Sequence, residues 1–347
     1  MGRVELVSVL IPAWDSAAWV GEAIESALAQ THPRLEVVAV DDGSTDGTSE
    51  ALRSFGERIR WERTPHRGAA AARNRLLELA RGEWVQYLDA DDLLLPGKIE
   101  RQLAAARAAG DADLVASPYL SATGRTLRGP HGHDPWLCFL EGRLGTTSSH
   151  LFRREALVRI GGWEAWRRAA QEQDLLQRLL ASGALFAFLD EALCIKRRVN
   201  PRSLWRSIWR EDPKAAREAD VSPVAAAVRH LREEGALTPE REAAAGARFL
   251  LMARSAWRRG AWGWEAVLAE AETLQLPERA LLSASSLTYR AIYRARGFAA
   301  AERYAERDAA LRRSGWRWRK RARRVFSRWR DRGRAVLAAV QARGAER

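Results

Sequence analysis

The sequence contains few cysteines and no long apolar run, and each shortage excludes a class of protein. Two cysteines, Cys138 and Cys194, occur among 347 residues, far apart and without a CxxC or Cys/His spacing. We therefore expect neither a disulfide framework nor a zinc site, and a reducing compartment suits such a chain. No stretch of about 18 uninterrupted apolar residues occurs, so no membrane-spanning helix is predicted. The N-terminus lacks the pattern of a secretory signal, which favours a cytoplasmic protein.

The common phosphate-binding loops are also missing. The sequence contains neither GxxxxGKS nor GxxxxGKT, and no GxGxxG follows the first predicted strand. These absences disfavour a P-loop NTPase and a dinucleotide-binding enzyme. A nucleotidyltransferase would need a Gly-rich, basic loop directly after that strand, and Pro12-Ala13-Trp14-Asp15 stands there instead.

The basic charge is concentrated at the C-terminal end. The net charge is +13, and residues 311–347 hold 14 Lys/Arg against 2 acidic residues, which leaves +1 for the rest of the chain. Within this segment Trp318, Val325 and Trp329 belong to an apolar stripe at helical spacing beside a cationic face. This pattern predicts an amphipathic helix, peripheral on the inner face of the cytoplasmic membrane and held by anionic lipid. Docking on the rest of the protein and nucleic-acid binding are the alternatives.

Strand and helix patterns alternate through the first half of the chain. Apolar runs at 6–11, 35–40, 59–63 and 84–88 predict strands, and the periodicity at 17–30 and 68–80 predicts helices. This order predicts an α/β fold with a mainly parallel sheet covered by helices. Strand runs disappear beyond about residue 200, where stretches such as 224–234 and 241–259 predict a helical region.

Polar clusters follow three of the predicted strands, beginning at Pro12, Asp41 and Asp89. In open parallel sheets ligands bind outside the carboxyl ends of the strands, so all three clusters should face one rim. If Asp89 and Asp91 lie two apart in an extended strand, both carboxylates point to one side and suit one hard divalent cation. The alternative is an Asp-rich turn in which Asp91 or Asp92 caps the next helix.

Together these segments closely resemble the nucleotide-sugar-binding half of family 2 glycosyltransferases of the GT-A fold. The resemblance is carried by VSVLIPAWDSAAWVGEAIESALAQTHPRLEVVAVDDGSTDGT and RGAAAARNRLLELARGEWVQYLDADDLLLPGKIERQ. It covers about residues 4–110 strongly and continues more weakly to about 196. The resemblance implies a Rossmann-like GT-A catalytic domain at 1–200. The composition of the rest of the chain predicts a helical region at 201–310 and the basic helix at 311–347.

The resemblance also implies a donor site on the rim. Nucleoside contacts are expected from the first two strand ends, at Pro12, Ala13, Asp15, Asp41 and Asp42. In the family a DxD motif holds the Mg²⁺ or Mn²⁺ that bridges the sugar-nucleotide diphosphate, which points to Asp89 and Asp91 as metal ligands. Ala90 lies between them, beside the donor. Arg73 is expected on the nucleotide side of the pocket or as a surface ion-pair partner.

The base expected from the resemblance lies in AAQEQDLLQRLL, residues 169–180. Many relatives have Glu-Asp where this chain has Gln171-Glu172, so Glu172 occupies the base position with a longer side chain, and Asp174 is the alternative. Both carboxylates are also ordinary first-turn charges favoured by the helix dipole. This departure motivates a second hypothesis, a catalytically weakened domain that acts as a binding or scaffolding module.

Further side chains are singled out by position. Relatives often carry a His where Arg198 or its neighbours stand, and a guanidinium suits a diphosphate but cannot bind a metal, so Arg197 or Arg198 is expected to clamp phosphate or form a surface salt bridge. Trp163 either lines the acceptor side or packs in the interior. His32 and His66 are expected to be polar surface residues.

The function predicted from the sequence is metal-dependent, inverting transfer of a sugar from a nucleotide-diphospho-sugar to an acceptor hydroxyl. A glycan or lipid-linked acceptor in cell-envelope or exported polysaccharide synthesis is expected, with nucleic acid unlikely as a partner. The metal would stabilise the diphosphate leaving group, and a carboxylate would take the proton of the attacking hydroxyl.

Overall fold

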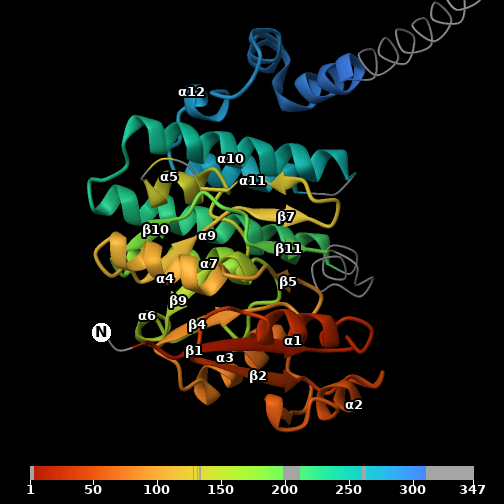
Figure 1. Ribbon diagram of the computed structural model, residues 1–347. Helices are drawn as coiled ribbons and strands as arrows, with labels where there is room; N and C mark the ends of the chain where they lie inside the picture. Colours follow the sequence, from red (N-terminus) through yellow and green to blue (C-terminus); the bar gives the residue numbers. More distant parts are fainter. Residues whose placement is uncertain are drawn as a thin grey trace, which may run out of the picture. The chain divides into compact units, whose positions relative to one another are not determined.

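A seven-stranded, mainly parallel sheet forms the centre of the first of two compact units, Met1–Ser283 and Ala284–Arg347 (Figure 1). The computed structural model describes residues 4–127, 129–130, 132, 134–197, 212–259 and 263–309. The strands lie in the order β10-β6-β9-β4-β1-β2-β3, with β9 antiparallel to both of its neighbours. The predicted α/β fold with a mainly parallel sheet is confirmed.

The four strands and two helices with predicted positions, β1 to β4, α1 and α3, fall close to them, and no bounds were predicted for the other elements of this half. The strands of the large sheet are β1 (Val7–Ala13), β2 (Leu35–Asp41), β3 (Arg60–Arg63), β4 (Trp84–Tyr87), β6 (Leu114–Ala116), β9 (Leu151–Arg153) and β10 (Phe186–Phe188). The helices of the same half include α1 (Val20–Leu28), α2 (Thr48–Arg53), α3 (Ala69–Leu79), α4 (Lys98–Ala108), α5 (Pro135–Leu140), α6 (Arg154–Arg159) and α7 (Gln171–Ala181). The first helix begins at Val20, later than predicted, because a turn precedes it in which the Trp19 N–H donates to the Ser16 carbonyl.

The chain changes direction across the sheet at β1. Strand β1 pairs in parallel with β2 on one side, with Ala13 opposite Asp41, and with β4 on the other, with Leu10 opposite Tyr87. The chain runs outward from β1 through β2 to β3 and then returns to β4. Such a reversal opens a crevice at the carboxyl ends of the strands, which is where ligands bind in sheets of this type.

A small second sheet brings distant residues to the end of β4. Its strands are β5 (Leu93–Leu94), β11 (Cys194–Lys196), β7 (Tyr119–Ser121) and β8 (Thr126–Leu127), paired in that order. Strand β11 is antiparallel to β5, with Cys194 opposite Leu94. This pairing places Lys196 beside a segment about one hundred residues earlier in the chain.

The predicted helical region is present, and its part up to Ser283 belongs to the first compact unit. It consists of α9 (Pro213–Glu233), α10 (Pro239–Arg258), α11 (Trp264–Thr273) and α12 (Glu278–Leu281). Helix α9 contacts α7 and α10 contacts α5, so these helices pack on two helices that connect strands of the large sheet. Trp257 and Trp264 meet edge to face at 5.9 Å, and Trp262 lies outside the described residues. Within the ranges given above, no helix combines the length and apolarity needed to span a bilayer.

A buried polar network joins β4 and α4 to residues 147–150. Lys98 is fully buried, and its Nζ donates to Gln86 Oε1 and to Gln102 Oε1. The amides of these two glutamines donate in turn to the carbonyls of Ser148, at 3.1 Å, and Ser149, at 2.8 Å. Burial lowers the pKa of Lys98 to about 7. The network fixes residues 147–150 against the sheet.

Gly82 is required by close packing before β4. A Cβ added there would lie 2.6 Å from Ser8 N and 2.8 Å from the Trp84 carbonyl oxygen. We expect Gly82→Ala to lower the free energy of unfolding by about 1–3 kcal/mol, the usual cost of overpacking. Urea unfolding of the full chain measures this change.

Gly21→Ala is the matched control, because Gly21 lies in α1 with nothing within 4 Å of an added Cβ. Its expected effect has the opposite sign, a gain of about 0.4–1 kcal/mol from the reduced freedom of the unfolded chain. Equal unfolding free energies for the two variants would contradict the packing assigned to Gly82.

Candidate active site

Aspartates at the end of β2 accept hydrogen bonds from the loops that form this part of the rim. The Asp41 carboxylate is buried and accepts hydrogen bonds from Ser44 N, at 2.9 Å, and from Ser49 Oγ. The Asp42 carboxylate accepts from the backbone N–H groups of Arg67, at 2.9 Å, and Gly68, at 2.8 Å. Both side chains therefore fix the loops at the rim.

Asp15 connects the first loop to the second. Its backbone is left-handed, with φ of 42°, and its Oδ1 accepts from Thr45 N at 2.9 Å, while its own N–H donates to Ser44 Oγ at 3.0 Å. The preceding residues Pro12 and Ala13 end β1, and the Ala13 carbonyl accepts from Asp42 N at 2.8 Å. The first two strand ends are thus held together by direct bonds.

One aromatic pair is exposed on this part of the rim. Trp14 is 39% exposed and stacks on His66 with the ring centroids 4.8 Å apart. His66 Nδ1 lies 2.9 Å from Asp42 Oδ2. The expectation that His32 is a surface residue is wrong, since it is buried and its Nε2 bonds the Glu5 carbonyl at 2.8 Å.

The stretch from Asp89 to Asp92 is a turn. Strand β4 ends at Tyr87, and the Asp92 N–H donates to the Asp89 carbonyl at 2.9 Å, which closes the turn. The expectation that Asp89 and Asp91 share a side because they lie two apart in an extended strand is therefore wrong in its geometry. The turn nevertheless keeps both residues at the end of β4, beside β1.

The predicted capping role of Asp92 is also wrong. Helix α4 begins only at Lys98, with Gly97 before it in the left-handed conformation. Asp92 is buried, and it accepts from Ser148 Oγ at 2.8 Å and from Arg197 N at 3.1 Å. Burial raises its pKa to about 7, although the charge of Lys196 acts in the opposite direction.

Cations from two distant parts of the chain offset the carboxylates at the end of β4. Arg73, on α3, donates to Asp89 Oδ1 at 2.8 Å, and Lys196 Nζ lies 3.7 Å from Asp89 Oδ2. Burial alone would raise the pKa of Asp89, but these two positive charges hold it below its ordinary value. The Arg197 guanidinium donates to the Asp91 carbonyl at 2.7 Å. Arg198 lies outside the described residues.

Arg73 also joins the turn to helix α7. Its second guanidinium nitrogen donates to Gln171 Oε1 at 2.8 Å, and the group lies 4.7 Å from the Trp163 ring centroid. Trp163 is 2% exposed and meets Tyr87 edge to face. Of the two interpretations of Trp163, interior packing therefore describes its position, and Arg73 is an internal connector rather than a surface ion-pair partner.

Glu172 and Asp174, both on α7, lie in different environments. Asp174 forms ion pairs with Arg167, at 3.1 Å, and with Arg178, at 2.9 Å. Glu172 Oε1 is buried without a hydrogen-bond partner and lies 3.7 Å from His150 Nδ1. Burial raises the pKa of Glu172 to about 7, with Lys196 opposing the shift. The two carboxylates that the sequence left as alternatives are thus distinguished by their partners.

His150 faces Glu172 as a neutral acceptor. Its Nε2 lies 2.8 Å from the Leu144 carbonyl, which requires the proton on Nε2 and leaves the Nδ1 lone pair toward Glu172. Burial lowers the pKa of His150 to about 4. His150 was missed in the sequence because it lies far from Glu172 along the chain. Lys196 was missed for the same reason, although it begins the basic run KRR.

The carboxylates of the turn fit a hard cation that shares its coordination with a substrate. Among the described residues there is no group of three or more His, Cys, Asp or Glu side chains arranged to hold a metal. Mg²⁺ is usually bound in proteins by one or two carboxylates together with substrate phosphates. Asp89 and Asp91 are two such carboxylates. In the structure, Asp89 Oδ2 lies near one cation, the Lys196 ammonium.

Comparison with known proteins places this site in a family. The model for "Glycosyl transferase family 2" matches residues 8–174. Hyaluronan synthase of Pasteurella multocida is 39% identical over 103 residues, which are 29% of this chain and 11% of that protein. The chain spans less than half the length of each curated relative compared.

Solved structures share the fold over most of the chain. TarS of S. aureus (1–349) matches with a TM-score of 0.59 and 19% identity over 86% of this chain and 89% of that one, and it has also been crystallised with UDP-GlcNAc. The mannosyltransferase PcManGT of Pyrobaculum calidifontis, in complex with GDP-Man and Mn²⁺, matches with a TM-score of 0.50 and 22% identity over 85% and 87% of the two chains. Residues 8–174 of this chain thus belong to the glycosyl transferase family 2, and the unit that contains them has the GT-A fold.

Proposed function

We propose that this protein is a metal-dependent, inverting glycosyltransferase that moves a sugar from a nucleotide-diphospho-sugar to an acceptor hydroxyl in polysaccharide synthesis. The observation that carries the proposal is the position of Glu172, a carboxylate with a buried Oε1 and a raised pKa, near the aspartates at the end of β4 whose charge Arg73 and Lys196 offset. The hyaluronan synthase relative supports a polysaccharide product, and the ligands of the two structural neighbours support a nucleotide-sugar donor.

The donor would lie along the rim from β2 to β4. The nucleoside end belongs beside Pro12, Ala13, Asp15, Asp41 and Asp42, where the loops are fixed by direct bonds. The diphosphate belongs at the turn, with Asp89, Ala90 and Asp91. A Mg²⁺ or Mn²⁺ held there by Asp89 and Asp91 acts, when bound, as a Lewis acid on the leaving group. Arg73 and Lys196 add fixed positive charge toward the same diphosphate.

Glu172 is the proposed base. A single displacement requires the acceptor hydroxyl to lose its proton as it attacks, and a raised pKa near neutral pH makes a carboxylate an effective acceptor of that proton. His150 Nδ1 lies 3.7 Å from Glu172 Oε1 and bears no proton, so it supplies no positive charge that would hold Glu172 ionised at low pH. Asp174 is excluded from this role in our proposal because two arginines already hold its carboxylate.

The acceptor is proposed to be a glycan, free or lipid-linked, reached at the inner face of the cytoplasmic membrane through the basic segment 311–347. That segment lies outside the described residues. The second hypothesis, a catalytically weakened scaffold, is motivated by Gln171-Glu172 in place of the Glu-Asp of many relatives. A protein that binds donors but neither transfers nor hydrolyses them would favour the scaffold.

The donor site is tested by thermal shift with UDP-, GDP- and dTDP-sugars, with and without Mn²⁺. We expect one donor to stabilise the protein in a Mn²⁺-dependent manner, and we expect Asp91→Asn to abolish that dependence because a metal ligand is lost. Asp111→Asn is the control, since Asp111 is exposed at a left-handed position that Asn adopts readily. A full Mn²⁺ response in Asp91→Asn would refute its metal role.

The base is tested by Glu172→Gln. We expect donor hydrolysis or transfer to fall by about 10²–10⁴-fold, the usual contribution of a general base, with donor affinity unchanged. Glu155→Gln, at an exposed position on α6, should leave the rate unchanged. If Glu172→Gln retains the wild-type rate while Asp174→Asn loses it, the assignment of the two carboxylates is reversed.

The pH dependence follows from the raised pKa of Glu172. The base must be ionised to accept a proton, so kcat/KM should fall as the pH drops through about 7. At higher pH the carboxylate is ionised and the rate should reach a plateau. An acid limb near pH 4.5, the ordinary range of a glutamate, would contradict the burial assigned to this side chain.

A further inference from the structure

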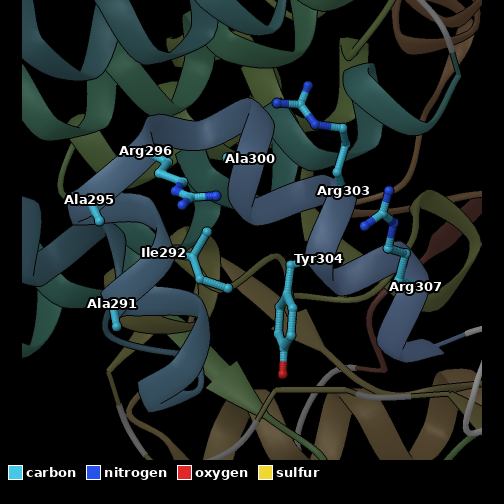
Figure 2. A pocket seen from close by; sticks show the side chains of 8 residues that line it. All are labelled: Ala291, Ile292, Ala295, Arg296, Ala300, Arg303, Tyr304 and Arg307. Carbon is cyan, nitrogen blue, oxygen red and sulfur yellow. The ribbon is translucent and has the colours of Figure 1, made fainter.

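An open hollow of about 550 Å³ lies in the second compact unit, between two helical arms formed by residues 287–309 (Figure 2). Gly297, with φ of 76°, separates the arms. Each arm contributes side chains to the hollow, among them Ile292 and Arg296 from the first and Arg303, Tyr304 and Arg307 from the second. Three arginines thus line one concave surface.

These three arginines form no ion pair within the described part of the chain, although Glu306 and Asp308 lie on the same arm as Arg307. Arg296, Arg303 and Arg307 are exposed, and none of them forms a hydrogen bond or ion pair with a described residue. The acidic side chain that is buried in the same unit, Glu302, accepts a hydrogen bond from the Tyr289 hydroxyl at 2.6 Å. Arg303 and Arg307 are four apart on one helix, a spacing at which like charges destabilise the helix slightly. An anion in the hollow would remove that cost.

The surface around the guanidinium groups is apolar. Ile292 and three alanines line the hollow beside the arginines. Leu287, 81% exposed, lies one helical turn before Ala291 and therefore on the same side of the first arm. Tyr304 adds an aromatic ring with a polar tip, a side chain favoured where apolar and aqueous regions meet. A free phosphate ion would gain little from these apolar groups, whereas the glycerol and upper acyl chain of a lipid would contact them.

The position of the hollow in the chain adds electrostatic support. The segment 311–347, with 14 basic and 2 acidic residues, begins two residues after the second arm ends. Basic side chains near an anionic leaflet each contribute about 1 kcal/mol to membrane binding. A cationic hollow that directly precedes such a segment suits the same partner.

We propose that the hollow of residues 287–309 binds the phosphate headgroups of an anionic membrane surface, with Arg296, Arg303 and Arg307 on the phosphates and Leu287 and Ile292 against the lipid below them. This site is separate from the donor site and does not depend on the proposed function. It is a second membrane contact, formed by folded helices, besides the one expected from the basic segment 311–347.

The test uses the full chain with vesicles of phosphatidylcholine containing phosphatidylglycerol, and with phosphatidylcholine alone. The variant replaces Arg296, Arg303 and Arg307 by Gln. A matched control replaces three exposed arginines of the first unit, Arg81, Arg232 and Arg258, by Gln, with the same change in net charge. We expect the hollow variant to lose at least tenfold in its partition coefficient for the anionic vesicles, and the control to stay within twofold of wild type.

Equal partitioning of the two variants would overturn the proposal. The proposal would also be overturned if both proteins bound the vesicles equally while a single-stranded RNA bound the wild type but not the hollow variant. The partner of the hollow would then be nucleic acid. Displacement from the vesicles by millimolar inorganic phosphate would assign the hollow to the free ion instead. Leu287→Gln, at an exposed position that the fold does not require, should weaken vesicle binding without a change of charge. Donor hydrolysis should stay at the wild-type rate in every variant.

Discussion

The balance of charge at the end of β4 is the constraint on which the rest of the site depends. Asp89 and Asp92 are brought together by a turn, and their mutual repulsion is offset by Arg73 and Lys196. These cations come from α3 and β11, which are distant in sequence. The pairing of β11 with β5 therefore places the Lys196 ammonium beside the carboxylates of Asp89 and Asp92. Losing one partner of such a buried pair typically costs about 3–5 kcal/mol.

The same balance gives neighbouring carboxylates different chemistry. Positive charge keeps the pKa of Asp89 low, whereas burial raises the pKa values of Asp92 and Glu172 to about 7. Carboxylates whose pKa values are pushed apart are suited to different tasks, one to hold positive charge and another to accept a proton. The neutral His150 beside Glu172 completes this arrangement, since its low pKa keeps it uncharged and its Nδ1, which faces Glu172, carries no proton to donate to the carboxylate.

The local patterns of the sequence were sufficient to predict the sheet, because buried parallel strands such as β1 are continuous apolar runs. The three polar clusters of the rim could also be located from the sequence, because each one directly follows such an apolar run. The role of Asp92 could not be found from local pattern, because its partners Ser148 and Arg197 are distant in the chain. The choice between Glu172 and Asp174 was partly accessible, since Arg178 lies four residues after Asp174 at ion-pair spacing. Burial of Glu172 beside His150 required the fold.

The central claim is that Asp89 and Asp91 hold a divalent cation against a nucleotide diphosphate while Glu172 stays on the acceptor side. Crystals grown with Mn²⁺ and a nucleoside diphosphate, with anomalous diffraction recorded at the manganese edge, test it most directly. We predict one strong peak within coordination distance of the carboxylates of Asp89 and Asp91 and of the diphosphate oxygens, with Glu172 not ligating the metal. A diphosphate bound with its manganese on other residues, or on Glu172, would contradict the claim.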